Sequence, residues 1–323
     1  MPLRIVFCGT PAFAVPTLLA LAAQPDFEIA GVITQPDRPS GRGQQVSISS
    51  VKNAALAAGI PVYQPERIKE EAAQQYLQTA AADLIVIIAY GQIIPARLIA
   101  IPRLGWINLH GSLLPKYRGA APIHWAVANG EKRTGLTTMQ IDAGLDTGPM
   151  LLKHETEIGA DETSPELYAR LAEAGAPLMV ETLRGLAAGT LKSTPQDDSQ
   201  KTFAPPLKKE DGRIDWSRRA AEIYNRMRGF QPWPGAFTTF RGKTCQVWGK
   251  PAAEAAATAP IPATSDAPAA PGTLSVKNGE VWVAAGHGTS LKLETVQMEG
   301  RKKVAAREFA NGARLAPGEK FGD

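Results

Sequence analysis

The chain opens with an apolar strand that leads through a short turn into a helix and a second strand. Residues 3–8 are rich in strand formers, 13–21 have the apolar spacing of a helix, and 28–34 are apolar again. An uninterrupted apolar strand needs cover on both faces, which is typical of a parallel sheet wound with helices. This opening predicts an α/β fold with a Rossmann-like, mostly parallel sheet.

The alternation of strands and helices continues to about residue 205. Helices are expected at 50–58, 69–81, 121–129 and 163–187, and strands at 62–63, 83–89, 106–109, 135–141 and 150–155. After Pro205-Pro206 the pattern changes to one helix followed by short strands. The helix is expected at 217–228 and the strands at 236–241, 244–249, 272–276, 280–284 and 290–297.

Many short strands indicate a small OB-like β-barrel. We therefore expect two domains, 1–205 and 206–323. Residues 251–271 interrupt the second domain, because 15 of these 21 residues are Ala or Pro. Such a composition cannot build a core, so a disordered-like surface loop is expected there.

Composition limits where the chain works and what it binds. The apolar share is 44%, no apolar run approaches the ~20 residues of a membrane span, and the start lacks the order of a signal peptide. The two cysteines, Cys8 and Cys245, lie far apart in the sequence, which favours a reducing cytoplasm. Residues 1–205 carry 17 basic and 19 acidic side chains, whereas 206–323 carry 18 and 12. A basic second half is compatible with a polyanionic partner, although six extra charges also suit an ordinary surface.

Common cofactor motifs are missing. Gly9-Thr10-Pro11 follows the first strand, but the G-x-G-x-x-G pattern of dinucleotide binding does not occur, nor does a P-loop. The His, Cys and Asp residues show no metal-ligand spacing, so no metal is expected.

Two segments carry side chains suited to catalysis. Asn108 and His110 lie one residue apart at the end of an apolar strand, and a Gly- and Pro-rich loop follows. Alternation places both on one side of the strand, at the carboxyl edge where open α/β sheets bind ligands. Asp146 lies in Asp142-Ala143-Gly144-Leu145-Asp146-Thr147-Gly148, where glycines permit a tight loop. A structural histidine and a plain hairpin turn are the alternatives.

These residues together resemble the signature of the folate-dependent formyltransferases. The resemblance includes Asn108, His110, the Ser112-Leu113-Leu114-Pro115 turn and Asp146. It extends to Gly9-Thr10-Pro11, Ala89-Tyr90-Gly91 and Pro232-Trp233-Pro234. It implies that Asn108, His110 and Asp146 are catalytic and that 10-formyltetrahydrofolate is the formyl donor. The implied folate pocket is lined by Ile88, Ala89, Tyr90, Gly91, Ser112, Leu113, Leu114, Pro115 and Leu145.

Direct attack by an amine through a tetrahedral intermediate is the expected chemistry. Asn108 and His110 would donate hydrogen bonds to the developing oxyanion. Asp146 would keep His110 charged or help to pass a proton from the amine to the folate. The sequence leaves both roles open.

A loop near the N-terminus predicts which substrate accepts the formyl group. Residues 34–45 resemble the inserted loop with which the family members that act on methionyl-initiator tRNA grip its acceptor end. Arg38 and Arg42 can pair with phosphate or stack on bases. Gln44 and Gln45 stand where this family usually has proline and further lysine, which weakens or moves the expected grip. A solvated connection is the alternative reading of this loop.

Further basic residues are expected to follow the RNA backbone, namely Lys208, Lys209, Arg301, Lys302 and Lys303. The expected partners are therefore methionyl-initiator tRNA and folate, with no membrane and a monomeric chain. Two alternatives are another folate enzyme, acting on a sugar nucleotide or releasing formate, and a non-catalytic RNA-binding protein. The loop at 36–45 argues against the first and the intact Asn108, His110 and Asp146 against the second.

Overall fold

The computed structural model describes residues 1–40, 45–252 and 269–322. The chain divides into two compact units. The first unit contains residues 1–123, 133–158 and 166–205, and the second unit contains 124–132, 159–165 and 206–323. Among the described residues, no helix has both the length and the apolar character needed to cross a bilayer.

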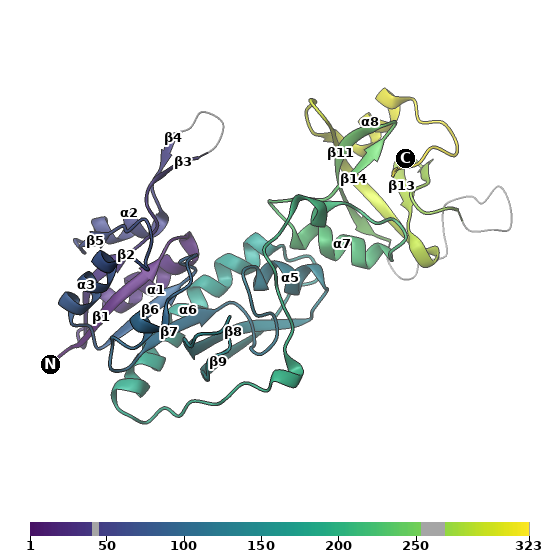
Figure 1. Cartoon of the computed structure of the whole chain (residues 1–323). Coiled ribbons are helices and arrows are strands. Elements are labelled where there is room, and N and C mark those ends of the chain that lie inside the picture. The colour runs from purple at the N-terminus through teal and green to yellow at the C-terminus, as the bar shows by residue number, and fades with distance from the viewer. Residues whose placement is uncertain (41–44, 253–268, 323) are drawn as a thin grey trace. The chain divides into compact units, whose positions relative to one another are not determined.

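The first unit is built on a seven-stranded sheet in the order β5-β2-β1-β6-β7-β8-β9 (Figure 1). The strands from β5 to β7 run parallel, and β8 and β9 are antiparallel to their neighbours. Their bounds are β1 Leu3–Gly9, β2 Phe27–Ile33, β5 Val62–Tyr63, β6 Leu84–Ile88, β7 Trp106–His110, β8 Arg133–Gln140 and β9 Met150–Glu157. This confirms the expected Rossmann-like α/β class.

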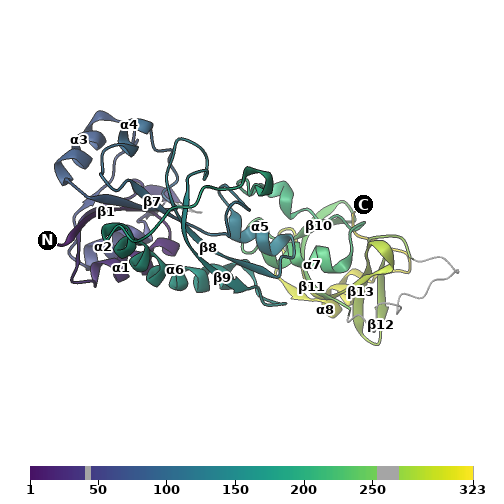
Figure 2. The ribbon, with the colours of Figure 1, turned by 90° about the horizontal axis from the view of Figure 1, so that it is seen from below.

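Helices cover both faces of this sheet, as Figure 2 shows. One face carries α1 (Val15–Ala22) and the long α6 (Ser164–Ala187), and the other carries α3 (Glu71–Ala80) and α4 (Ala96–Ile99). The remaining helices of the first 205 residues are α2 (Ser50–Ala57) and α5 (Pro122–Ala128). Because both faces are covered, the inner strands are apolar throughout, and all five residues of β6 are buried.

The segment between β2 and α2, for which the sequence predicts an inserted loop, contains two short strands. β3 (Arg38–Ser40) and β4 (Gln45–Ser47) pair as an antiparallel ribbon. The base of this ribbon is fixed by polar contacts. Thr34 Oγ1 and Ser49 Oγ lie 2.8 Å apart, and Lys52 forms an ion pair with Asp37. These contacts hold the two ends of the ribbon together, although the segment is rich in Pro and Gly. Arg42 lies outside the described residues.

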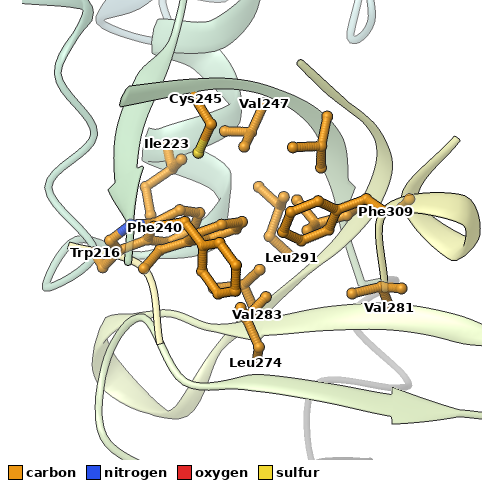
Figure 3. Packing of buried hydrophobic residues seen from close by; sticks show 14 of the residues in the cluster. Trp216, Ile223, Phe240, Cys245, Val247, Leu274, Val281, Val283, Leu291 and Phe309 are labelled. Atoms are coloured by element: carbon orange, nitrogen blue, oxygen red, sulfur yellow. The ribbon is translucent and has the colours of Figure 1, made fainter. Parts of the chain in front are cut away.

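The second unit contains an antiparallel sheet in the order β10-β11-β14-β13-β12, with β15 paired to β14. Its elements are α7 Ala220–Gly229, β10 Phe237–Phe240, β11 Lys243–Pro251, β12 Leu274–Lys277, β13 Glu280–Ala284, β14 Ser290–Met298, β15 Val304–Ala305 and α8 Ala306–Ala313. Figure 3 shows its core, where Trp216, Phe240 and Phe309 point toward the apolar residues of the strands. Most of the expected Ala- and Pro-rich loop, residues 253–268, lies outside the described part of the chain.

Candidate active site

Strand β7 carries the two candidate side chains that are closest in sequence. It lies between β6 and β8, where the sheet changes from parallel to antiparallel pairing. Trp106 and Ile107 are completely buried and fix the strand in the core. Asn108 and His110 alternate along the strand with Ile107 and Leu109, and no hydrogen bond joins the Asn108 side-chain amide to a described residue. This amide is therefore available to a ligand.

His110 is buried, and its two ring nitrogens have different neighbours. Nε2 lies 2.9 Å from the carbonyl oxygen of Tyr117. A carbonyl oxygen only accepts, so Nε2 must carry the hydrogen. Nδ1 lies 3.7 Å from Oδ2 of Asp146, which is longer than a hydrogen bond but within ion-pair range. The structure thus brings His110 and Asp146 together with the carboxylate facing the ring.

Asp146 is held in an unusual backbone conformation. Its φ of 52° lies in the left-handed region, which costs a non-glycine residue steric energy. The backbone amide of Gly119 donates to Asp146 Oδ2 at 2.8 Å. The carboxylate therefore lies between the Gly119 amide and the His110 ring, and it is mostly shielded from water, with 15% of the side chain exposed.

Arg118 and Gln196 support this loop, and sequence reasoning missed both. The Gln196 amide donates to the carbonyl oxygens of Asp146 and Gly148, each at 2.8 Å. Arg118 donates to Gln196 Oε1 through Nε and Nη2, at 3.0 and 2.8 Å. No local motif marks these positions, because the partners are 50 and 78 residues apart along the chain.

The turn at residues 112–115 is tied to the antiparallel edge of the sheet. Thr137 Oγ1 donates to the Ser112 carbonyl at 2.7 Å and accepts from the Leu114 amide at 3.1 Å. Lys153 donates to the Leu114 carbonyl at 2.7 Å. Ser112 and Leu114 are completely buried, whereas Leu113 and Pro115 are partly exposed. A ligand beside this turn would therefore touch Leu113 and Pro115 first.

The other expected folate wall, residues 88–91, presents backbone more than side chains. Ile88 and Tyr90 are buried, and Ala89 and Gly91 are exposed with φ values of 48° and 86°. The Tyr90 ring packs in an apolar cluster of the core. The Tyr90 carbonyl oxygen accepts from Gln35 Nε2 at 2.9 Å. Leu145, in the loop before Asp146, is 62% exposed.

The basic residues expected to contact RNA lie at the surface wherever the structure describes them. Arg38 on β3 is 3.4 Å from Glu66. Lys208 and Lys209, at the start of a 3₁₀ turn, are exposed. The cluster Arg301-Lys302-Lys303 is exposed, and Lys303 Nζ lies 3.6 Å from the centre of the Trp248 ring.

The described part of the first unit contains one cysteine, Cys8, and no cluster of metal-ligating side chains. Cys8 is buried in β1, and burial raises the pKa of its thiol well above the ordinary value. In the described ranges, no group of three or more His, Cys, Asp or Glu side chains is placed to hold a metal ion. Among the expected catalytic residues, His110 and Asp146 carry the titratable groups, and these two groups lie within ion-pair range.

Comparisons with known proteins agree over both units. A family model described as "Formyl transferase" matches residues 3–183, and one described as "Formyl transferase, C-terminal domain" matches residues 206–314. A methionyl-tRNA formyltransferase of Solibacter usitatus is 54% identical over 321 residues, covering 99% of each chain. One of Acidobacterium capsulatum is 52% identical, covering 99% of this chain and 100% of that protein.

Solved structures share the fold at low identity. A sugar 3N-formyl transferase, WlaRD, crystallised in the presence of dTDP and 5-N-formyl-THF, has a TM-score of 0.64 and 18% identity, over 94% of this chain and 100% of that one. An N-formyltransferase from Helicobacter canadensis, in complex with folinic acid and dTDP-3-aminofucose, has a TM-score of 0.62 and 16% identity, over 92% and 100%. At these identities the likeness concerns the fold.

Proposed function

This chain belongs to the formyl transferase family, and from this premise we propose that it formylates the α-amine of methionyl-initiator tRNA with 10-formyltetrahydrofolate as donor. The observation that carries the proposal is the 54% identity over 99% of both chains to a relative named for this reaction. The ion-pair geometry of His110 and Asp146 supports it chemically.

The reaction exchanges one carbon–nitrogen bond for another. The neutral methionyl amine, whose pKa is about 7.7–8.0, attacks the formyl carbon to give a tetrahedral species. The bond from that carbon to N10 of the folate then breaks, and a proton moves from the amine to N10. Nothing is oxidised or reduced, and no covalent bond to the protein is needed.

Asn108, His110 and Asp146 have complementary parts in this scheme. The Asn108 amide, which has no other partner in the described chain, donates to the oxyanion. His110 Nε2–H is engaged by Tyr117, so Nδ1 is the ring nitrogen that exchanges a proton. The Asp146 carboxylate, 3.7 Å from Nδ1, is placed to help pass this proton on towards the folate.

The formyl donor is proposed to lie between the 88–91 edge and the 112–115 turn. Exposed backbone at Ala89 and Gly91 can pair with the polar edge of a pterin ring, and the partly exposed Leu113 can cover its face. Such a slot, mostly apolar with a few fixed polar groups, is the usual form of a small-molecule site. Ser112 and Leu114 are buried and anchor the turn through their backbone hydrogen bonds to Thr137.

The β3–β4 ribbon and the basic residues of the second unit are proposed to bind the tRNA. Arg38 is exposed on a ribbon whose base is anchored by Asp37 and Lys52. Lys208 and Lys209 and the 301–303 cluster supply further charge for phosphates. A monomeric cytoplasmic enzyme fits this substrate, because charged tRNA is used in the cytoplasm and neither Cys8 nor Cys245 forms a disulfide.

A labelled formyl-transfer assay tests the proposal. The acceptors are methionyl-initiator tRNA, methionyl-elongator tRNA, other aminoacylated tRNAs and a dTDP-amino sugar, and free formate is measured in parallel. We expect transfer to initiator tRNA with kcat/KM far above that of every other acceptor. Preferred transfer to the amino sugar, or formate release as the main reaction, would refute the proposal.

A further inference from the structure

The segment that follows α6 crosses both loops of the candidate active site. Thr194 exchanges two backbone hydrogen bonds with Met150, each of 2.8 Å. Arg118 donates its amide to the Thr202 carbonyl and accepts from the Ala204 amide, at 2.9 and 2.8 Å. The same stretch of chain therefore joins the loop that contains Tyr117, the partner of His110, to the loop that contains Asp146.

Gln196 lies between the two attachment points and uses all of its hydrogen-bonding groups. Its Oε1 accepts twice, from Nε and Nη2 of Arg118. Its Nε2 donates twice, to the carbonyl oxygens of Asp146 and Gly148. A side-chain amide offers two donors and one oxygen with two lone pairs, so no capacity is left over.

The buried Arg118 sets the orientation of this amide. A guanidinium has donors and no acceptor, so the oxygen of Gln196 must face it and the NH₂ group must face the two carbonyls. Only 2% of Arg118 is exposed, and its charge is balanced by Asp198 at 2.8 Å. A charge buried in this way is paired or strongly destabilising, which keeps the guanidinium in place.

Asp146 needs such support, because its left-handed φ of 52° is disfavoured for a residue with a side chain. Neither Arg118 nor Gln196 lies in a strand of the seven-stranded sheet. We propose that Arg118 and Gln196 are positioning residues for the formyl transfer described above: together they hold Asp146 in the conformation that presents its carboxylate to His110. This inference rests on the proposed function for its kinetic readout.

The proposal is tested with Gln196→Leu, which removes the amide and keeps most of the volume. Misplacing a catalytic group by about 1 Å costs about 10²-fold in rate. We expect kcat to fall by about this factor, while the KM values for tRNA and formyl donor stay within about twofold. The control is Gln200→Leu, four residues later, whose amide donates to Asp197 and not to the catalytic loop. It should leave kcat unchanged.

A double-mutant cycle separates positioning from general stability. If Gln196 acts through Asp146, adding Gln196→Leu to Asp146→Asn should change kcat by less than about twofold, because the group it positions is already gone. If the full loss recurs in the double variant, or KM rises instead of kcat falling, the proposal is overturned.

A second readout does not depend on the acceptor. The Gly119 amide donates to Asp146 Oδ2, so its hydrogen exchange should quicken in Gln196→Leu and stay slow in Gln200→Leu. Equal exchange in both variants would contradict the proposal. If the parent enzyme prefers another amine, the proposed function fails. The role of Gln196 is then still decided by the double-mutant cycle, repeated with that amine, and by the hydrogen exchange of the Gly119 amide.

Discussion

His110 is the residue whose surroundings most limit the chemistry of the site. Its Nε2 is committed to the Tyr117 carbonyl, whereas Nδ1 faces Asp146 across 3.7 Å. This separation leaves Nδ1 able to take a proton and return it without breaking a short bond. The ring is therefore oriented by one nitrogen, and the proposed proton exchange falls to the other.

Replacing His110 by Ala removes the ring nitrogen that is proposed to exchange the proton. We expect kcat to fall by about 10²–10⁴, with tRNA binding nearly unchanged, measured by single-turnover formyl transfer and filter binding. The matched control is His154→Ala, since His154 is exposed on β9. Full turnover of the His110 variant would exclude the proposed role.

A second prediction at this scale concerns stability. The Tyr90 hydroxyl is buried and makes no hydrogen bond to any described residue, and burial raises the pKa of this phenol. An unsatisfied buried hydroxyl destabilises the folded state, so Tyr90→Phe should raise the free energy of unfolding by about 1 kcal/mol. Urea unfolding of the full chain measures this.

The control variant, Tyr168→Phe, is expected to change the free energy of unfolding in the opposite direction. The Tyr168 hydroxyl accepts from the Phe13 amide at 3.1 Å, so Tyr168→Phe leaves that amide unpaired. It should lower the free energy of unfolding by about 1 kcal/mol. If Tyr90→Phe destabilises the protein as much as Tyr168→Phe, the hydroxyl of Tyr90 has a partner after all.

Among single residues, those with a compact signature could be predicted and those with distant partners could not. Asn108 and His110 stand out at a strand end and Asp146 in a Gly-rich turn, but their approach in space was implied only by the resemblance to the folate-dependent formyltransferases. Arg118 and Gln196 resembled ordinary polar residues. Their importance arises from contacts across 50 and 78 residues of chain, which a local pattern does not encode.

At the scale of elements, the β3–β4 ribbon depends on a small polar base. The pKa of Asp37 is lowered, first by the hydrogen bond from Lys52 and then by that from Gln64. A lowered folded-state pKa means that the ionised carboxylate favours the folded form above the unfolded value of about 3.9. This contribution is lost as the pH falls through the lower folded-state pKa.

We therefore expect amide exchange in β3 and β4, corrected for its intrinsic pH dependence, to quicken as the pH falls from about 3.9 towards the lower folded-state pKa. In Asp37→Asn the ribbon should open equally readily over this range, because the titrating group is gone. Asp161→Asn, a change in the second unit, serves as the control. A pH step that persists in Asp37→Asn would show that another group controls the ribbon.

Regular elements were the easier part of the prediction. The expected strand at 280–284 coincides with β13, and the helix expected at 163–187 differs from α6 by one residue. The ribbon was missed because Pro39 and the glycines around it favour a loop, and three-residue strands have too few positions for alternation to be visible. Their pairing is instead fixed by Thr34, Ser49, Asp37 and Lys52 at the base.

At the scale of the whole molecule, the uneven charge leads to a prediction about salt. Residues 206–323 carry 18 basic and 12 acidic side chains. Changing Arg301, Lys302 and Lys303 to Ala should raise the KM for tRNA. It should also reduce the slope of log KM against log salt by up to ~0.9 for each phosphate that the variant no longer neutralises. Transfer kinetics at several salt concentrations measure this.

The control variant removes the same charge elsewhere in the second unit: Lys243, Lys277 and Arg307 to Ala, all exposed. It lowers the net charge of residues 206–323 from +6 to +3, as the first variant does. Equal effects of the two variants would mean that tRNA responds to overall charge and not to direct binding at 301–303.

The stretch from Thr194 to Ala204 has a practical consequence for chimeras that join the N-terminal part of one family member to the C-terminal part of another. The family model described as "Formyl transferase" ends at residue 183, yet Gln196, which bonds the Asp146 loop, and Thr194, which pairs with Met150, lie beyond it. A chimera joined at 183 would inherit a complete sheet, but its Asp146 loop would lack the hydrogen bonds from its own Gln196. The workable crossover point is Pro205-Pro206, so exchange of acceptor specificity between relatives should succeed only when the donor parent supplies everything up to that proline pair.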